Sequence, residues 1–235
     1  MIEKIKFELL KLKNKKQAEA FKKFYKTSKN EYANKEIFLG ISVPKQREIA
    51  KKYISISLNE IKKLLKYKIH EYKMSASIIL VEKFNLENSK EIVDFYIKNA
   101  KLFSNWDLVD LTAPRILGKY LLKKEKKILR KLSNSKNIWE RRISIVSTHT
   151  FIKNGKIIDA LNICKELLKD EEDLIKKAVG WTLREIGKKD KKTLENFLRK
   201  NYENISRIAL RYAIEKFSKE ERNFYLSYKL SSGLN

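Results

Sequence analysis

The sequence predicts an all-α protein, and its composition and periodicity are the first two reasons. The chain of 235 residues contains 6 Gly and 2 Pro, whereas sheet proteins use many more of both in their turns. Apolar residues recur at helical spacing, for example in EIVDFYIKNAKLF (91–103) and KIIDALNICKELLKD (156–170). The polar segments between such stretches are short, and none is long enough to separate two domains. We therefore expect one helical domain over residues 1–235.

A weak internal repeat is the third reason. Five segments each open a predicted helix with a polar or aromatic residue and continue with small and apolar residues: 71–84, 105–117, 140–152, 175–187 and 206–217. Spacings of 33, 36, 35 and 30 residues separate their aligned positions, which are Lys73, Trp106, Arg142, Lys177 and Arg207. A period in the thirties with two helices per repeat predicts an α-solenoid of HEAT-like repeats. A helical bundle is the alternative.

The repeat register also predicts a functional face. Equivalent positions in a solenoid line one surface, usually the concave one. The aligned residues would place four cations and one indole on that surface. Asp110 lies one helical turn after Trp106, and Trp181 lies one turn after Lys177. We therefore expect a concave basic face on which two tryptophans, one carboxylate and the guanidinium of Arg142 come together.

The charge of the chain points to a polyanionic partner. The net charge is +25, from 54 Lys and Arg against 29 Asp and Glu. A positive excess of this size creates a field that attracts nucleic acid. Because only ten of the basic residues are Arg, a general bias toward lysine is the alternative explanation. Each Arg is therefore stronger evidence for a contact with an anionic partner than any Lys.

Several classes of protein are excluded or disfavoured. Cys164 is the only cysteine, which rules out a disulfide framework and a cysteine zinc site and favours a reducing compartment. His70 and His149 have no metal-ligating partner at useful spacing, and no phosphate-binding loop or nucleophile elbow is present. The N-terminus has no apolar signal core, and no run is long enough to span a membrane. We expect a cytoplasmic protein that uses no cofactor or metal.

The stretch SNWDLVDLTAPRILGKYL (104–121) contains the most unusual acid of the chain. Ser104 and Asp107 have the spacing of a helix-capping pair, which gives Asp107 a structural explanation. Asp110 lies beyond the first turn beside apolar residues, where a carboxylate is costly unless it is paired or functional. Both explanations stay open for Asp110. Pro114 is expected to kink this helix.

Tryptophan and arginine supply further candidates. Trp106 and Trp181 are either core residues or contacts for a cation, which the face of an indole attracts. Trp139 is expected to be a packing or loop-anchoring residue. Arg141 and Arg142 form the only Arg pair, and a guanidinium suits phosphate well, although a surface ion pair is the alternative.

A second basic segment begins near residue 40. GISVPKQREIAKKY (40–53) has Pro44 close to a predicted helix start. Lys45 and Arg47 follow it and would either contact phosphates of a nucleic acid or form a solvated face. Cys164, in contrast, lies within an apolar helical pattern and is expected to be a small core residue.

The motifs FLGISVPKQREIAKKY, NWDLVD, WERRISIV and AVGWTLREIGKKD resemble the AlkD-type DNA alkylation repair glycosylases. These are HEAT-like repeat proteins that excise cationic alkylated purines, and the motifs span roughly residues 32–190. The resemblance implies that Asp110 is catalytic, that Trp106 and Trp181 contact the lesion, and that Arg142 contacts a phosphate. The chain departs from the family pattern at Asn105, where a further Trp is usual, and at Ser42, where a Gln is usual.

The resemblance implies an N-glycosylase of base excision repair acting on alkylated double-stranded DNA. N3-alkyladenine and N7-alkylguanine carry a positive charge and leave as neutral bases, so the reaction needs one carboxylate, which would stabilise the oxocarbenium ion and position water. The expected phosphate contacts are Arg142, Arg141, Lys73, Lys177, Arg207, Lys45 and Arg47. We expect a monomer that does not bind membranes. The alternatives are a non-catalytic HEAT-like protein that binds damaged or branched DNA, and a solenoid that binds an acidic protein.

Overall fold

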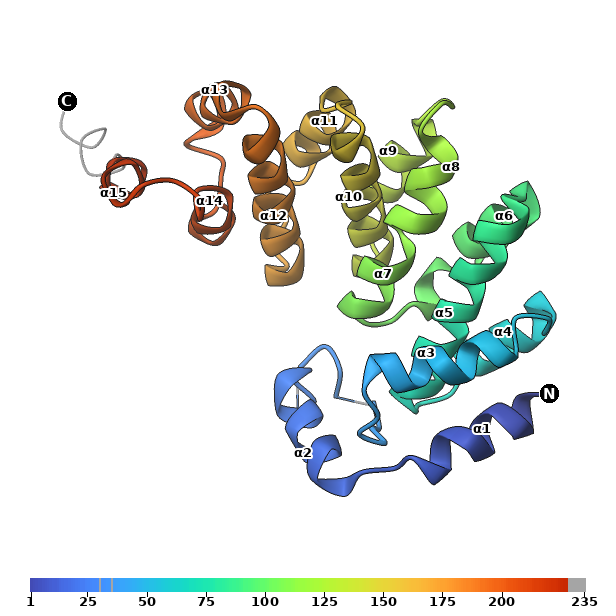
Figure 1. The fold of residues 1–235 in the computed structure, drawn as a ribbon. Coiled ribbons are helices and arrows are strands. Elements are labelled where there is room, and N and C mark those ends of the chain that lie inside the picture. Colours follow the sequence, from blue (N-terminus) through green and yellow to red (C-terminus); the bar gives the residue numbers. More distant parts are fainter. Residues whose placement is uncertain (30, 35, 228–235) are drawn as a thin grey trace. The chain divides into compact units, whose positions relative to one another are not determined.

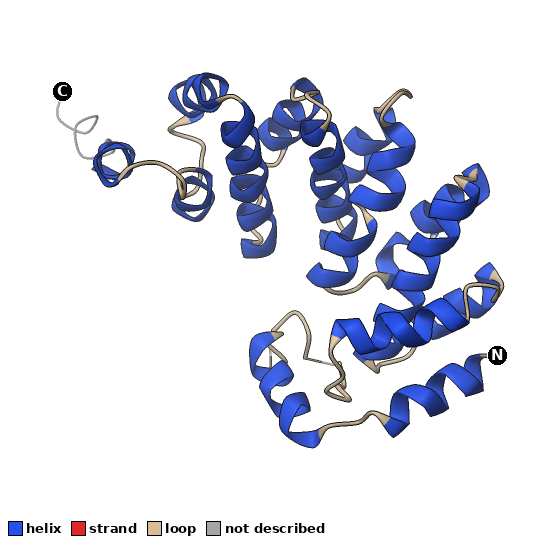
Figure 2. Ribbon diagram, viewed as in Figure 1, coloured by secondary structure: helices blue, strands red, loops and turns tan. Residues whose placement is uncertain are grey.

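The computed structural model describes residues 1–29, 31–34 and 36–227, and the secondary structure of these ranges is helical (Figure 2). Their one β feature is an isolated parallel bridge between Ile37 and Ile69. The chain packs as two compact units, unit 1 (Met1–Tyr120) and unit 2 (Leu121–Asn235). The predicted all-α class is therefore confirmed, whereas a single domain over 1–235 stays a prediction. No described helix is both long and apolar enough to cross a membrane.

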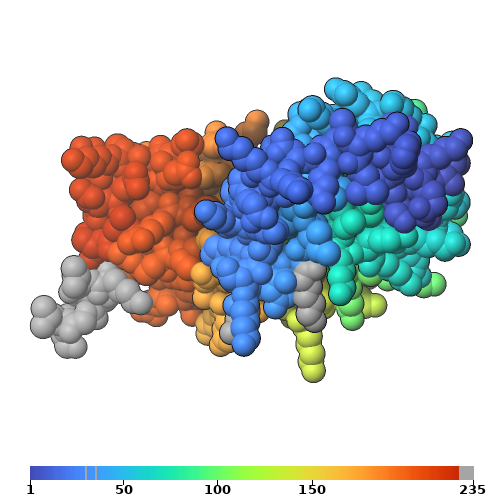
Figure 3. Space-filling model, turned by 90° about the horizontal axis from the view of Figure 1, so that it is seen from below, coloured from blue at the N-terminus to red at the C-terminus, as the bar shows by residue number. Residues whose placement is uncertain are grey.

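Unit 1 is built around one buried helix. α5 (His70–Glu87) carries small and apolar residues on all sides and is buried along most of its length. α3 (Val43–Lys52), α4 (Leu58–Leu65) and α7 (Trp106–Thr112) pack against it (Figure 1). α1 and α2, dark blue and blue in Figure 3, lie at the surface of this unit. The remaining elements are α1 (Ile2–Lys11), α2 (Lys15–Phe24), α6 (Lys90–Lys98), η1 (Ala100–Leu102) and η2 (Pro114–Gly118).

Unit 2 repeats the same kind of packing. α10 (Ile138–Lys153) contacts α9 (Lys127–Ser133), α11 (Ile158–Glu166) and α12 (Asp173–Lys189). α12 in turn contacts α13 (Lys191–Asn201) and α14 (Arg207–Ala213) (Figure 1). The other elements are α8 (Lys119–Leu121), which crosses the boundary of the units, and α15 (Lys219–Ser227).

The predicted repeat register is visible in the helices. The five aligned residues all lie among the first five positions of a helix, which is α5 for Lys73, α7 for Trp106, α10 for Arg142, α12 for Lys177 and α14 for Arg207. Successive members of this set pack against each other, α5 against α7 in unit 1 and α10 against α12 against α14 in unit 2. The HEAT-like fold is confirmed.

The Phe-Leu-Gly element (38–40) before α3 forms a hydrogen-bonded connection to α5, which we call the joint. The buried carboxylate of Glu71 accepts the backbone N–H groups of Leu39, Gly40 and Ile41 at 2.9, 2.8 and 3.3 Å. Gly40 has a φ of +81°, and a Cβ there would lie 2.2 Å from the carbonyl oxygen of Asn14. Only glycine fits this position. The joint fixes the chain between α2 and α3.

The helix type changes at Pro114, whereas the expected kink stays a prediction. α7 ends at Thr112, and residues from Pro114 to Gly118 form the π-helical segment η2. The N–H of Gly118 donates to the carbonyl of Ala113 at 2.9 Å, which is the wider hydrogen-bond spacing of a π-helix. Because proline has no N–H, it cannot continue the α-helical pattern. The interruption limits the helix of Trp106 and Asp110 to about two turns.

Gly180→Ala is expected to destabilise unit 2 by about 2–3 kcal/mol, in spite of the higher helix propensity of alanine. A Cβ at Gly180 would lie 2.4 Å from the carbonyl oxygen of Ala209, so α12 and α14 would have to separate. Gly187→Ala on the same helix is the matched control, because its Cβ would meet the flexible end of the Leu194 side chain, also at 2.4 Å. Urea unfolding measures both free energies, and equal losses would contradict the prediction.

Candidate functional site

The start of α7 is held by a side chain that the sequence did not suggest as its cap. Asn105 is the N-cap residue, and its Oδ1 accepts the backbone N–H of Trp106 at 2.8 Å. The expected Ser104–Asp107 capping pair is therefore wrong. Ser104 instead accepts a hydrogen bond from the ammonium of Lys73 at 2.7 Å. Asn105 is also one of the two positions at which the chain departs from the family pattern, so this departure has a structural role.

The indole of Trp106 is half-buried among aromatic rings. It stacks on the ring of Tyr25, with the centroids 5.6 Å apart and 24° between the planes. The ring of Phe24 meets it edge-on at 5.7 Å. The indole Nε1–H donates to the hydroxyl of Tyr32 at 3.1 Å. These contacts combine packing with a fixed ring orientation, and they leave part of the indole accessible to a partner.

Asp110 lies one turn after Trp106 on the same helix and is also half-buried. Residues four apart on a helix share a face, so the carboxylate and the indole are neighbours on α7. The apolar residues Leu108 and Val109 of the same helix are buried. The geometry of unit 1 thus keeps the predicted pair of Trp106 and Asp110 together.

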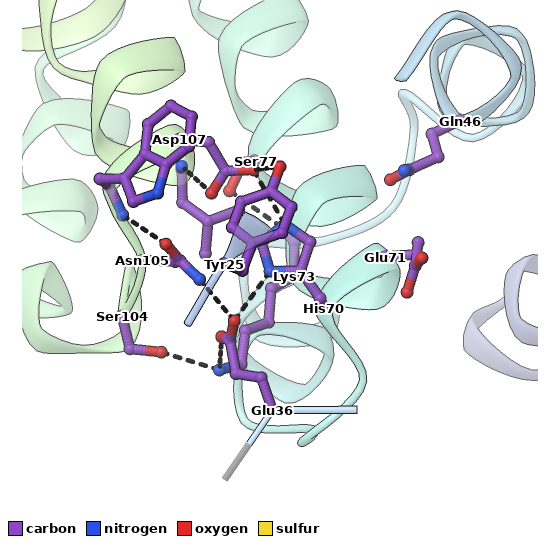
Figure 4. Close-up of polar contacts among 12 residues, drawn as sticks. Tyr25, Glu36, Gln46, His70, Glu71, Lys73, Ser77, Ser104, Asn105 and Asp107 are labelled. Atoms are coloured by element: carbon purple, nitrogen blue, oxygen red, sulfur yellow. Dashed lines mark hydrogen bonds and ion pairs between the residues drawn. The ribbon is translucent and has the colours of Figure 1, made fainter. Parts of the chain in front are cut away.

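A cluster of buried charges lies beside this pair (Figure 4). Its members are Glu36, His70, Lys73 and Asp107, which we call the ion cluster. The imidazole of His70 bridges the two carboxylates, with Nδ1 3.0 Å from Glu36 Oε2 and Nε2 2.9 Å from Asp107 Oδ2. The Lys73 ammonium donates to Glu36 Oε1 at 2.8 Å. All four side chains are at least 89% buried, the most exposed being Asp107 at 11%.

The ion cluster perturbs the pKa values of its members. Burial lowers the pKa of His70, but the charge of Asp107 and the hydrogen bonds to Asp107 and Glu36 outweigh it and raise that pKa to about 10. Burial raises the pKa of Glu36, but the hydrogen bond and charge of His70 and those of Lys73 lower it overall. His70 is therefore an imidazolium at neutral pH. The cluster then contains two positive and two negative groups.

Lys73 has a different role from the one expected. The sequence placed it among the phosphate contacts, but it is buried and its ammonium is bound to Glu36 and Ser104. A phosphate contact by Lys73 would have to break a buried ion pair, which costs several kcal/mol. Lys73 therefore belongs to the interior of unit 1. Its repeat position alone could not show this.

Trp181 of unit 2 is half-buried and lies against the second histidine. The ring of His149 meets the indole edge-on with the centroids 4.2 Å apart, and His149 Nε2 is 2.9 Å from the hydroxyl of Thr182. Burial lowers the pKa of His149 to about 4, so this ring is neutral at physiological pH. A neutral histidine and a threonine thus fix the orientation of Trp181.

The two arginines of the Arg pair are both engaged within unit 2. Arg141 forms a bidentate ion pair with Asp170, at 2.6 and 3.3 Å, and its Nη1 also donates to the carbonyl of Ser135. Arg142 is buried and donates to the carbonyl of Leu174 at 2.6 Å. Arg141 therefore forms an ion pair, as the alternative explanation proposed, but the pair is largely buried and does not lie at the surface. Phosphate contacts by these two residues stay predictions.

The remaining predicted phosphate contacts differ in accessibility. Lys45 and Arg207 are exposed, whereas Arg47 and Lys177 are half-buried. Arg207 donates to the carbonyl of Leu226 at 2.7 Å, and Arg47 lies 4.0 Å from Glu82. Lys45 and Arg207 are therefore the members of the set with the most accessible charge.

Sequence reasoning missed the ion cluster. Glu36 belongs to no sequence motif, and His70 has no metal-ligating partner at useful spacing in the sequence. The contacts of His70 join residues 34 and 37 positions apart in the chain, so no local pattern shows them. Within the described residues, no group of His, Cys, Asp and Glu is arranged to hold a metal ion. The one sequence feature that pointed toward the ion cluster was Asp107, a second acid in the segment that contains Trp106 and Asp110.

The fold defines a helical-repeat protein. It carries an indole and a carboxylate on one short helix, and its net charge is +25. The family model described as DNA alkylation repair enzyme matches residues 5–217, and the chain belongs to this family. The substrate of the family is DNA. No curated protein sequence matches the chain significantly.

Solved structures support the fold assignment. The chain is similar to a predicted DNA alkylation repair enzyme from Enterococcus faecalis, with a TM-score of 0.73 and 19% identity over 88% of this chain and 97% of that one. It is also similar to AlkD2 from Streptococcus mutans, with a TM-score of 0.56 and 19% identity over 87% and 99% of the two chains. For smu.31 from Streptococcus mutans UA159 the TM-score is 0.51, with 20% identity over 82% and 92%. At these identities the similarity concerns the fold.

Proposed function

We propose that the protein is a DNA glycosylase of base excision repair that removes cationic alkylated purines, such as N3-alkyladenine and N7-alkylguanine, from duplex DNA. The observation that carries the proposal is the pair of Trp106 and Asp110, one turn apart on α7 and both half-buried. The indole is fixed by Tyr25, Phe24 and Tyr32, and the carboxylate is its neighbour on the helix. Membership of a DNA alkylation repair family supports the same conclusion.

Asp110 acts on the sugar in this mechanism. The glycosidic bond breaks with both electrons going to the base, which starts with a positive charge and leaves neutral, so no general acid is required. The positive charge appears on the deoxyribose as an oxocarbenium ion. The Asp110 carboxylate stabilises that charge electrostatically and positions the water that attacks C1′. The water forms the new bond to C1′ and gives up one proton to solvent, and an abasic site remains.

The tryptophans act on the lesion in this mechanism. An alkylated purine is a cation, and the face of an indole attracts a cation by about 0.5–2 kcal/mol. Trp106 supplies this contact in unit 1. Trp181, which occupies an equivalent face in the repeat register, is the second proposed contact. The protein would work on DNA in the cytoplasm, as a monomer and without a cofactor.

The test is base release from duplex DNA that contains N3-methyladenine and N7-methylguanine. We expect the protein to release both bases under single-turnover conditions and to leave abasic sites. Undamaged duplex of the same sequence is the control and should yield no free base. Tight binding of the methylated duplex with no base release would overturn the glycosylase proposal.

A non-catalytic protein that binds damaged or branched DNA is the second candidate, and the burial of Arg142 favours it. A guanidinium that donates to the Leu174 carbonyl is less available for a phosphate beside the reacting sugar. This candidate predicts binding without base release and no effect of Asp110 substitutions. A solenoid that binds an acidic protein, the third possibility, predicts no preference for duplex DNA over other polyanions.

Exposed lysines should contribute to the salt dependence of DNA binding. Each phosphate that the protein neutralises makes the slope of log affinity against log salt more negative by about 0.9. Lys45→Gln is expected to reduce the magnitude of this slope by about one unit, because Lys45 is an exposed proposed phosphate contact. Lys90→Gln is the matched control, since Lys90 pairs with Asp94 at 2.5 Å. Fluorescence anisotropy with undamaged duplex measures both slopes, and equal slopes would remove Lys45 from the interface.

A further inference from the structure

The ion cluster joins three parts of unit 1 that lie far apart in the chain. Glu36 belongs to the segment before α3, His70 and Lys73 belong to the first turn of α5, and Asp107 belongs to the first turn of α7. Figure 4 shows these side chains pointing toward one another from their separate elements. The cluster therefore determines how the beginning of α7 is attached to the rest of the unit.

Two connections run from the cluster to Trp106. The first passes through Asn105, whose Nδ2–H donates to Glu36 at 2.6 Å while its Oδ1 accepts the backbone N–H of Trp106 at 2.8 Å. The second passes through Tyr25, whose hydroxyl donates to Asp107 at 2.8 Å while its ring stacks on the indole. The backbone and the ring of Trp106 are thus each fixed by a residue that the cluster holds.

The cluster is suited to positioning and not to chemistry on DNA. Its two carboxylates are matched by the imidazolium of His70 and the ammonium of Lys73, so it adds no net charge beside the phosphates. Every member is buried, and each carboxylate already accepts hydrogen bonds from at least two donors. Its effect on a bound nucleotide is therefore transmitted through α7, which it holds, and through the ring of Tyr25.

We propose that the ion cluster is a positioning device in which Glu36, His70 and Asp107 set the orientation of Trp106 and Asp110 for work on DNA. The effect on base release rests on the proposed function. The effect on the orientation of Trp106 does not depend on it. Asp107 is the residue next to Trp106 and is three residues before Asp110, so a shift of its carboxylate moves the first turn of α7. Misplacement of a reacting group by about 1 Å can reduce a rate by roughly 10²-fold.

The structural part is tested with 5-fluorotryptophan. The chain has 3 Trp, so the labelled protein gives three fluorine resonances, and loss of one in Trp106→Phe assigns Trp106. His70→Gln is expected to shift the Trp106 resonance and leave those of Trp139 and Trp181, which belong to unit 2, in place. His149→Gln is the matched control and should shift the Trp181 resonance only, because His149 contacts Trp181. An unmoved Trp106 resonance in His70→Gln would overturn the proposal.

The functional part is tested with the same variants on methylated duplex. His70→Gln should reduce the single-turnover rate of base release on the order of ten- to a hundred-fold. Its affinity for undamaged duplex should change less than about two-fold, since the cluster is buried and has no net charge. An unchanged rate, or a loss of affinity equal to the loss of rate, would overturn the positioning role.

Tyr25→Phe keeps the test decisive if His70→Gln does not fold. It removes one hydroxyl and retains the ring that stacks on Trp106. The expected result is a smaller shift of the Trp106 resonance and a smaller loss of rate. If the wild-type protein releases no base, the proposed function fails and the fluorine spectra alone decide on the positioning role.

Discussion

Asp110→Asn is expected to reduce the rate of base release, whereas Asp107→Asn is expected to reduce the stability of the fold. The two acids lie only three residues apart on α7. Asp110→Asn should reduce the single-turnover rate of base release by about 10²–10³-fold, because the amide removes the negative charge that opposes the oxocarbenium ion. Its melting temperature should stay within about 3 °C of wild type, since substitutions at partly exposed positions are usually within about 0.5 kcal/mol. Base release and thermal unfolding are measured on the same preparations.

Asp107→Asn is expected to lose stability first. The Asp107 carboxylate is 11% exposed and accepts hydrogen bonds from His70 and Tyr25. Removing its charge leaves the imidazolium of His70 with one carboxylate partner in a buried site, at a cost of about 3–5 kcal/mol. The melting temperature should fall by roughly 6–20 °C. A stable Asp107→Asn variant together with an unstable Asp110→Asn variant would reverse the two roles.

The repeat register shows how much the sequence could predict. Lys73, Trp106, Arg142, Lys177 and Arg207 were aligned from spacing alone, and all five lie at helix beginnings. This succeeded because each repeat buries its second helix against the next one, so small and apolar residues must recur at the same place. The scarcity of Gly and Pro identified the fold class for a related reason, since helices need few sharp turns.

The register could not predict what each of the aligned side chains contacts. Lys73 and Arg207 occupy equivalent positions, but Lys73 is buried in an ion pair while Arg207 is exposed. The difference comes from Glu36, which lies outside the repeat and contacts Lys73 from 37 positions away. The buried guanidinium of Arg142 donates a hydrogen bond to the carbonyl of Leu174, which lies 32 positions away in the chain. Partners of this kind depend on packing between elements, which no local pattern records.

The motifs shared with the family divide between structural and functional roles. Gly40 of the Phe-Leu-Gly element is required by a φ of +81° and a close backbone approach, and Glu71 satisfies the backbone N–H groups around it. That motif therefore maintains the fold. The Trp-Asp-x-Val-Asp motif combines both roles, since Asp107 belongs to the ion cluster and Asp110 is the proposed catalytic carboxylate.

The two histidines should give the stability of the protein an optimum near pH 6.5. The pKa of His70 is raised to about 10, so its contribution is fully present below the unfolded value of about 6.5 and is lost as the pH rises toward 10. The pKa of His149 is lowered to about 4, so its contribution is fully present above about 6.5 and is lost as the pH falls toward 4. Each contribution is on the order of 3–5 kcal/mol.

Thermal unfolding from pH 4.5 to 9.5 should therefore show a melting temperature that declines on both sides of the optimum. We call the decline above pH 6.5 the alkaline limb and the decline below it the acid limb. His70→Gln is expected to flatten the alkaline limb and His149→Gln the acid limb, so each variant is the control for the other. Glu36 does not contribute in this range, because its pKa lies below the ordinary value and its contribution is lost only as the pH falls through that lower pKa. An alkaline limb that persists in His70→Gln would show that His70 is not the imidazolium of the ion cluster. It would then also remove the charge balance on which the positioning role of that cluster depends.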